Sequence, residues 1–216
     1  MTVENVLKYG VRILIIFMVL PIHEYAHAFA ARKLGDRTAE NMGRLSLNPI
    51  SHIDPIGAIC LVLTGFGWAK PVPVNPNRFK HIRSGSIITA LAGPLSNIIV
   101  GYIGLVLYKF VVFIFMAEMT QTIYYVEIIL SYFVVVNLSL AIFNLLPIPP
   151  LDGSRVLTTF LPLKYQWKIQ DYQMYISLAF LVIIFSGILD YPLNFLVNLL
   201  FSVIDFLSGW VDIIFM

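Results

Sequence analysis

YGVRILIIFMVLPIHEYAHAFAA, residues 9–31, decides the fold of this 216-residue chain. The run is long enough for a transmembrane helix, which needs about 20 apolar residues to cross about 30 Å of hydrocarbon. Three ionisable side chains, His23, Glu24 and His27, interrupt it within five residues. Ionisable groups inside a membrane span are costly and mark functional sites. We therefore expect a transmembrane helix that carries a functional site.

The pattern His23-Glu24-Tyr25-Ala26-His27 places two histidines at i and i+4. On a helix these side chains share one face, so both imidazoles can bind one metal ion. Glu24 lies about 100° around the helix from His23, where it can contact metal-bound water without being a ligand. Zinc lowers the pKa of its bound water toward about 7, and a neighbouring carboxylate can accept the proton. The motif predicts a zinc-dependent hydrolytic site, and a polar patch between helices is the alternative.

The composition of the chain is that of a membrane protein. Hydrophobic residues make up 59% of it and charged residues only 12%, whereas soluble domains carry about 25% charged residues. A net charge of +2 is too small for binding through a basic surface, so we expect no nucleic-acid partner. The single cysteine, Cys60, excludes an intramolecular disulfide and a thiolate metal cluster. The expected environment is the lipid bilayer.

Five long apolar runs predict an all-α polytopic membrane protein, a bundle of about five to six transmembrane helices. The runs are residues 9–31, 85–116, 121–146, 172–189 and 192–211, the last of which carries polar residues and could lie at the membrane interface. Residues 56–69 are too few for a span and rich in glycine, which favours a re-entrant segment. We expect residues 1–216 to form one membrane-embedded domain, with a catalytic core over about 9–160 and C-terminal helices over about 172–211.

The basic residues predict the orientation of the chain in the cell membrane. Eleven of the fourteen Lys and Arg residues lie in or beside the connection between the first two runs and the connection after the third. Cytoplasmic loops carry such an excess of positive charge. We therefore expect the active site and the re-entrant segment toward the cytoplasmic side, with the N-terminus outside.

A catalytic zinc site needs three protein ligands and one open position, so a third ligand must come from outside residues 23–27. The candidates are Glu40, His52, His81 and Asp152. Glu40 lies in a charged stretch typical of a solvated loop, and we interpret both histidines as non-ligands because loop charges surround them. Asp152 follows the third run on the side of the two histidines, among prolines and a glycine that allow the chain to turn back. It is the predicted third ligand, and a plain Asp-Gly turn is the alternative.

Several separated motifs resemble those of the site-2 protease family of intramembrane zinc metalloproteases. They are His23-Glu-Tyr-Ala-His27, Gly67-Trp-Ala-Lys-Pro-Val-Pro-Val-Asn-Pro76, Gly93-Pro94-Leu-Ser-Asn97 and Asn144-Leu-Leu-Pro147-Ile-Pro-Pro-Leu-Asp152-Gly153. Together they cover about residues 10–160. The resemblance is to the minimal branch of the family, without a PDZ or CBS domain.

This resemblance implies that His23, His27 and Asp152 hold one Zn²⁺ per chain. It also implies that Glu24 is the catalytic carboxylate and that Asn144 lies near the scissile carbonyl. The implied function is regulated intramembrane proteolysis, the hydrolysis of peptide bonds in or near the transmembrane segments of protein or peptide substrates. A membrane metal-ion transporter or metal sensor with the same ligands is the alternative, although transport needs no glutamate beside the ligands.

Two stretches between the first two runs predict a small β-element beside the site. Residues 43–48 alternate polar and apolar side chains, and residues 71–76 contain prolines that favour extended edge backbone over helix. We expect this edge to pair with an unwound substrate strand, and an inert loop on the membrane surface is the alternative. Asn97 and Asn137 lie within runs, where they are expected to join helices or to support the ligands.

Overall fold

The computed structural model describes residues 3–64, 67–116 and 120–215, and the regular elements in these ranges are all helical. This confirms the all-α prediction. The α-helices are α1 (Val3–Leu14), α2 (Leu20–Lys33), α3 (Thr38–Asn41), α4 (Pro55–Thr64), α5 (Ile82–Phe115), α6 (Gln121–Leu145), α7 (Asp152–Phe160), α8 (Leu163–Asp171), α9 (Gln173–Phe185), α10 (Asp190–Leu207) and α11 (Gly209–Phe215). A π-helical turn, η1 (Ile15–Val19), joins α1 to α2, and η2 (Pro49–Ser51) and η3 (Pro76–Arg78) are 3₁₀ turns.

Four helices within the described ranges are long and apolar enough to cross a membrane, namely Tyr9–Lys33, Ile82–Phe115, Gln121–Leu145 and Asp190–Leu207. The protein is therefore a multi-pass membrane protein, but the predicted number of five to six spans is not confirmed. The run 172–189 forms α9, whose 13 residues extend about 20 Å at 1.5 Å per residue. That length is less than the thickness of the hydrocarbon core.

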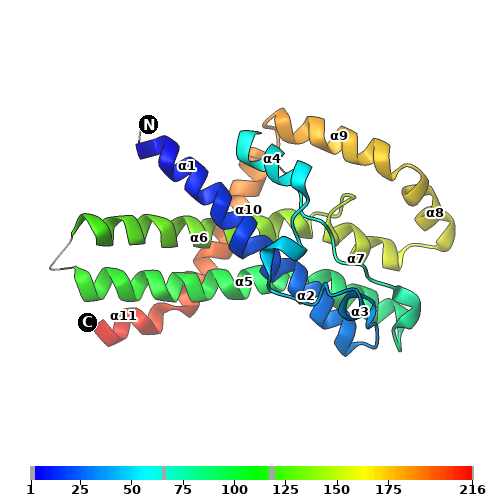
Figure 1. Ribbon diagram of the computed structural model, residues 1–216, viewed down its shortest axis with the longest axis horizontal. Helices are drawn as coiled ribbons and strands as arrows, with labels where there is room; N and C mark the ends of the chain where they lie inside the picture. The colour runs from blue at the N-terminus through cyan, green and yellow to red at the C-terminus, as the bar shows by residue number, and fades with distance from the viewer. Residues whose placement is uncertain (1–2, 65–66, 117–119, 216) are drawn as a thin grey trace.

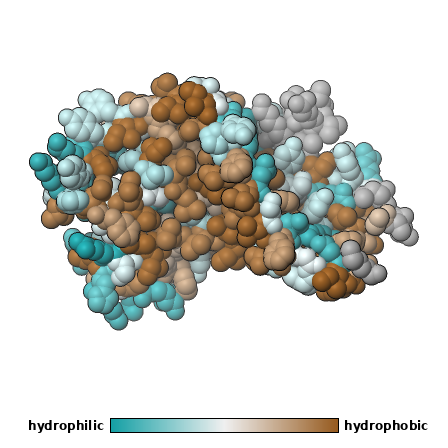
Figure 2. Space-filling view, turned by 180° about the vertical axis from the view of Figure 1, so that it is seen from behind, coloured by the Kyte–Doolittle hydropathy of each residue, from teal (hydrophilic) through white to brown (hydrophobic). Residues whose placement is uncertain are grey.

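The long helices α5 and α6 lie side by side and form the centre of the bundle, with α2 crossing α5 and α10 packing on α6 (Figure 1). The core between them consists of Leu105, Val134, Leu138 and Ile204, each at most 3% exposed. Figure 2 shows apolar side chains over the middle of one face and hydrophilic side chains at the end where α3 and α8 lie in Figure 1. This distribution fits a bundle whose flanks contact lipid.

The first span contains a π-helical turn directly before the histidine motif. Pro21 follows this turn at the start of α2. A proline removes one backbone hydrogen bond of a helix and its ring clashes with a carbonyl one turn earlier. A π turn accommodates such a break without ending the helix. The span therefore continues through residues 20–33 and carries the motif on a regular turn.

Ile53 and Ala69, which flank α4 and the residues after it, lie next to each other. Ile53 and Ala69 form an isolated antiparallel bridge, and the Lys70 N–H donates to the His52 carbonyl at 2.9 Å. The guanidinium of the buried Arg12 donates to the Val62 carbonyl near the C-terminus of α4. A cation at the negative end of a helix dipole is favourable, so this contact fastens α4 to the first span.

The prediction that residues 43–48 and 71–76 form a small sheet is wrong, although the structure describes every residue of both segments. Neither segment belongs to a strand, and Pro76 at the end of the second segment begins η3. Pro71 and Pro73 have no N–H to give to a ladder, and the N–H of Val72 donates instead to Glu24. The β-pairing that is present is the Ile53–Ala69 bridge.

An ion cluster joins α5 to the C-terminal helices. Lys109 Nζ lies 2.8 Å from Asp205 Oδ1 and 2.9 Å from Asp212 Oδ2. Beside this cluster the Trp210 Nε1–H donates to the Tyr102 hydroxyl at 3.0 Å. These contacts hold α10 and α11 against α5.

Candidate metal centre

Three side chains from two distant parts of the chain converge at one point inside the bundle. His23 and His27 come from α2, and Asp152 is the first residue of α7. His23 and His27 are each 6% exposed and Asp152 is 9% exposed. The Asp152 Oδ2 lies 3.2 Å from His23 Nε2 and 3.1 Å from His27 Nε2, and the two Nε2 atoms are 3.0 Å apart. The structure thus brings together the three residues expected as ligands.

The triangle formed by these three atoms fits a divalent metal ion. Zinc binds imidazole nitrogen and carboxylate oxygen at about 2.0–2.2 Å in tetrahedral geometry, so two of its ligand atoms lie about 3.3 Å apart. The three separations in the structure, 3.0 to 3.2 Å, agree with this value. Two imidazoles and a carboxylate are also the donor types that zinc prefers. The residues present therefore fit a zinc ion.

A backbone carbonyl orients His27 toward the common point. The Nδ1 of His27 lies 2.7 Å from the carbonyl oxygen of Thr89 in α5, so Nδ1–H donates and the lone pair of Nε2 is free for a metal. Metal-binding histidines almost always donate their second ring nitrogen in this way. His23 differs, because its buried Nδ1 has no hydrogen-bond partner among the described residues.

Gly93 of α5 allows this helix to lie directly behind both imidazoles. A Cβ at this position would be 2.4 Å from His27 Nε2 and 2.5 Å from His23 Cε1. Such distances are impossible without displacing one of the rings. The glycine of the Gly93-Pro94 motif is therefore required by the space that the histidines occupy.

Asp152 is held at the site by the packing of α7 against the end of α6. A Cβ on the next residue, Gly153, would be 2.2 Å from the Leu145 carbonyl oxygen, so a glycine is needed for this close approach. Burial raises the pKa of the Asp152 carboxyl, but when Nε2 of His23 and of His27 carries a proton, the hydrogen bonds and charges of the two rings outweigh burial and hold the pKa well below its usual range. Asp152 is therefore a carboxylate at neutral pH, which is the form that binds metals.

Glu24 lies beside the triangle but is not part of it. Glu24 is 8% exposed, and its Oε2 accepts a hydrogen bond from the Val72 N–H at 2.9 Å. This bond fixes one carboxylate oxygen and ties residues 71–76 to α2. Glu24 shares a cavity of about 390 Å³ with the three candidate ligands, where it can exchange a proton with a water molecule.

Asn144, near the C-terminal end of α6, lines the same cavity. Its Nδ2 donates to the Leu140 carbonyl at 3.0 Å. An amide nitrogen carries two hydrogens, so one donor is left for a molecule in the cavity. The structure thus brings Asn144 to the cavity that contains the three candidate ligands.

Comparison with known proteins agrees with this geometry. The model of peptidase family M50 matches residues 11–184, which include all of the candidate site. The chain belongs to peptidase family M50. The resemblance to site-2 proteases drawn from the motifs is thereby confirmed.

The M50 chain is similar to three curated proteins. "Putative zinc metalloprotease YwhC" of Bacillus subtilis is 40% identical over 172 residues, 80% of this chain and 78% of that protein. "Putative zinc metalloprotease Rip2" of Mycolicibacterium smegmatis is 29% identical over 160 residues, 70% of this chain and 59% of that protein. "Zinc metalloprotease MJ0392" of Methanocaldococcus jannaschii is 25% identical over 162 residues, 75% of this chain and 38% of that protein. No solved structure gives a significant match.

The other polar residues considered as ligands lie apart from the M50 site. Glu40 pairs with Arg32 Nε at 3.0 Å. The buried His52 bonds through Nε2 to the Ser46 carbonyl at 2.6 Å, and His81 is exposed before α5. His52 therefore has a structural role, and His81 faces solvent.

Asn97 and Asn137 are the two asparagines expected to join helices or to support the ligands. Asn137 donates within its own helix, from Nδ2 to the Phe133 carbonyl at 2.8 Å. The amide of the fully buried Asn97 has no hydrogen-bond partner in the part of the chain that the structure describes. Neither side chain makes the hydrogen bond expected of it.

Sequence reasoning missed two backbone groups of the M50 site. The Thr89 carbonyl orients His27 and the Val72 N–H holds Glu24. Backbone groups leave no mark in residue types, so no signal could have found them. The space requirement at Gly93 could have been suspected from a glycine before a proline inside a span.

Proposed function

We propose that this M50 peptidase is an intramembrane zinc metalloendopeptidase that hydrolyses peptide bonds in or near the transmembrane segments of membrane proteins, as in regulated intramembrane proteolysis. The observation that carries the proposal is the triangle of His23, His27 and Asp152 with Glu24 beside it, buried among helices long enough to span a membrane. The names of the three relatives support zinc as the metal and a peptide bond as the target. Residues 9–160, which hold all of these groups, form the proposed catalytic core.

His23, His27 and Asp152 are the proposed ligands of one zinc ion per chain. Bound zinc supplies a Lewis acid for the scissile carbonyl and lowers the pKa of a water molecule. Glu24, fixed by Val72, accepts the proton of the attacking water and returns it to the leaving amine. The free N–H of Asn144 donates to the oxygen of the scissile carbonyl as negative charge develops there.

A second cavity beside the metal cavity supports a substrate that arrives from within the membrane. A second cavity of about 380 Å³ lies between the first span, α6 and α10. It shares Leu20, Leu140 and Phe143 with the metal cavity. Most of its lining is apolar, so a transmembrane segment can pass from lipid to the metal site without leaving an apolar surface.

Residues 71–76 remain the proposed backbone partner of the substrate, although they form no sheet with residues 43–48. Val74 lines the metal cavity, and its backbone N–H and carbonyl make no hydrogen bond with the described residues. An unwound substrate strand can pair with these groups. We place the site toward the cytoplasm because Arg32, Lys33 and most other basic residues lie at this end of the bundle.

Substitution of Glu24 tests the proposal. Purified Glu24→Gln protein in vesicles should lose cleavage of a membrane-embedded substrate and keep its zinc, because Glu24 is not a ligand. Glu40→Gln is the matched control, since Glu40 lies in surface ion pairs, and it should retain activity. Full activity of Glu24→Gln would exclude Glu24 from the reaction. Zinc movement across the membrane by wild-type protein without any cleavage would favour the transporter instead.

A further inference from the structure

A third cavity adjoins the metal cavity on the side of the N-terminal end of α5. Its volume is about 620 Å³, and its walls come from α5, α7, the segment around Val72 and the start of α8. It shares Val72, Val74 and Arg155 with the metal cavity, so the two spaces meet along this border. We call this cavity the side chamber.

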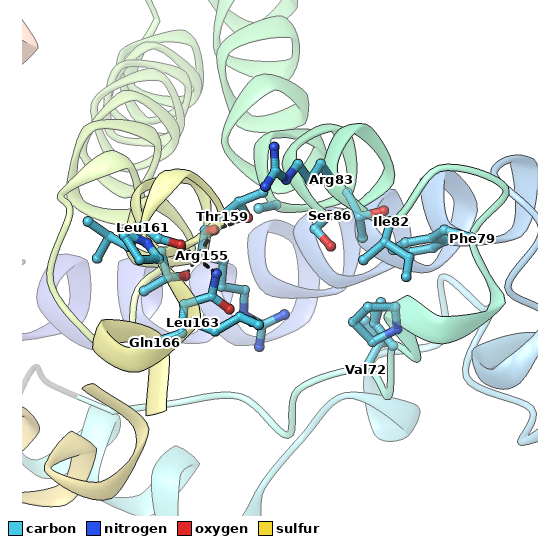
Figure 3. A pocket seen from close by; sticks show the side chains of 16 residues that line it. Val72, Phe79, Ile82, Arg83, Ser86, Arg155, Thr159, Leu161, Leu163 and Gln166 are labelled. Atoms are coloured by element: carbon cyan, nitrogen blue, oxygen red, sulfur yellow. Dashed lines mark hydrogen bonds between the residues drawn. The ribbon is translucent and has the colours of Figure 1, made fainter. Parts of the chain in front are cut away.

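Two arginines give the side chamber a positive charge. Figure 3 shows Arg83 projecting from α5 and Arg155 from α7. Both are exposed, and neither guanidinium has an ion pair or a hydrogen bond with the described residues. No Asp or Glu lines the chamber. Its cationic groups are therefore uncompensated, which favours an anionic occupant.

The position of Arg155 relates this charge to the proposed cleavage site. Arg155 follows Asp152 by three residues on α7, and residues three apart on a helix lie on one face about 5–6 Å from each other. It also lines a further cavity of about 430 Å³, which again contains no acidic residue. The metal cavity, the side chamber and this further cavity all border Arg155, and the acidic side chains that line them are Glu24 and Asp152 of the metal site. Arg155 thus stands where the three cavities meet.

The position of Arg83 sets the length of chain that the chamber can hold. Arg83 precedes Gly93 by ten residues of α5, which is about 15 Å along a helix. An extended chain covers this distance with about four or five residues. A substrate bond at the metal would therefore place residues within about five positions of it beside the two arginines.

We propose that the side chamber receives the substrate segment adjoining the cleaved bond, and that Arg83 and Arg155 select acidic side chains in that segment. The proposal rests on the proposed peptidase function and adds a substrate preference to it. Continuity with the metal cavity favours a stretch of the substrate chain over a lipid headgroup. Charge complementarity favours Glu or Asp over neutral residues.

Binding to an inactive background tests the preference independently of cleavage. The probes are two fluorescent single-span peptides whose flank carries five Glu or five Gln residues, presented to full-length Glu24→Gln protein in phosphatidylcholine vesicles. We expect the Glu peptide to bind about tenfold more tightly. Arg83→Gln in the same background should remove most of this preference, and Arg83→Glu should favour a peptide with five Lys.

Lys168→Gln is the matched control, because Lys168 is an exposed cation of α8 outside the side chamber. It should keep the tenfold preference, and unchanged zinc content should show that each variant is folded. Equal binding of the Glu and Gln peptides, or no binding of either, would overturn the proposal. So would loss of the preference when anionic phosphatidylglycerol is added, since a lipid headgroup would then occupy the chamber. Binding as expected without cleavage by wild-type protein would instead refute the peptidase function alone.

Discussion

The helix α5 contacts two polar clusters of different design. At Gly93 it backs the His23–His27–Asp152 triangle, and 16 residues later, about 24 Å along the helix, Lys109 pairs with Asp205 and Asp212. In the Lys109 cluster opposite charges contact each other directly. In the triangle three electron-pair donors face one another beside a cavity of about 390 Å³.

This difference distinguishes a polar cluster that stabilises the fold from one that can bind a metal. Unlike charges within 3 Å of each other attract, and solvent can satisfy the remaining lone pairs of the two exposed carboxylates. Three lone pairs at the same separation repel one another unless a cation or protons lie between them. The Lys109 cluster is therefore complete in itself and the triangle is not. We infer that removing the first costs stability, whereas removing the second costs metal and activity.

The largest effect is expected from Gly93→Ala. The new methyl group would collide with both imidazoles, so zinc should be lost and cleavage should fall by about 10³-fold or more. Gly101→Ala on the same helix is the control, because its Cβ would come no closer than 3.1 Å, to the flexible end of Leu138. Zinc analysis and cleavage rates measure both variants. Normal zinc content in Gly93→Ala would contradict the geometry of the triangle.

A smaller loss of zinc binding is expected from Asp152→Asn. The amide keeps the size of the carboxylate but removes the charge that faces His23 and His27. Zinc affinity should fall by at least about 10²-fold, as ligands matter at least as much as the groups that support them. Competition with a chelator measures the affinity. An unchanged affinity would exclude Asp152 as a ligand.

Substitution in the Lys109 cluster should instead lower stability and leave zinc binding intact. Lys109→Met removes the cation between Asp205 and Asp212, whose side chains are 49% and 37% exposed. Because solvent reaches both carboxylates, we expect a loss of only about 1–2 kcal/mol in the free energy of unfolding. Zinc content and cleavage at low temperature should be retained. Thermal unfolding measures the loss, and Lys164→Met on the exposed face of α8 should show none. Loss of zinc in Lys109→Met would mean that the two clusters are coupled.

The smallest effect concerns Asp36, which fastens residues 75–78 to the end of the first span. Its carboxylate accepts from the backbone N–H of Thr38 at 2.9 Å and from that of Asn75 at 2.6 Å. Burial raises its pKa, but a hydrogen bond from the Thr38 hydroxyl, the two backbone hydrogen bonds and the charge of Arg78 lower it by more.

A lowered folded-state pKa means that this stabilisation is present above the unfolded pKa of about 3.9 and is lost as the pH falls through the folded-state value. Asp36→Asn should therefore cost about 1 kcal/mol at pH 7 and progressively less below about pH 4. Unfolding curves across this pH range measure the difference. A difference that stays constant down to pH 2 would show that Asp36 does not titrate as its contacts imply.

Much of the fold and the centre of the site could be predicted from the sequence because they depend on local periodicity. Helical spacing alone places His23 and His27 on one face. Long apolar runs identify the spans, and the turn chemistry around Asp152 indicates its return to the bundle. Each of these signals lies within a few residues of the feature that it predicts.

What could not be predicted depends on contacts between distant backbone groups. The expected sheet did not form because Glu24 takes the Val72 N–H. The run 172–189 is apolar enough for a span, but its helix ends at Phe185 before the turn at Gly187, whose φ is +74°. The partners of Lys109 lie about 100 residues away along the chain. The sequence offers no local signal that pairs Lys109 with these two residues.

X-ray absorption at the zinc edge of the purified wild-type protein tests the convergence of the three ligands most directly. The account predicts one zinc per chain with nitrogen and oxygen neighbours at about 2.0–2.2 Å and the scattering pattern of two imidazoles, one of which disappears in His27→Ala. A zinc site with a sulfur neighbour from Cys60, or active protein that contains no metal, would contradict it.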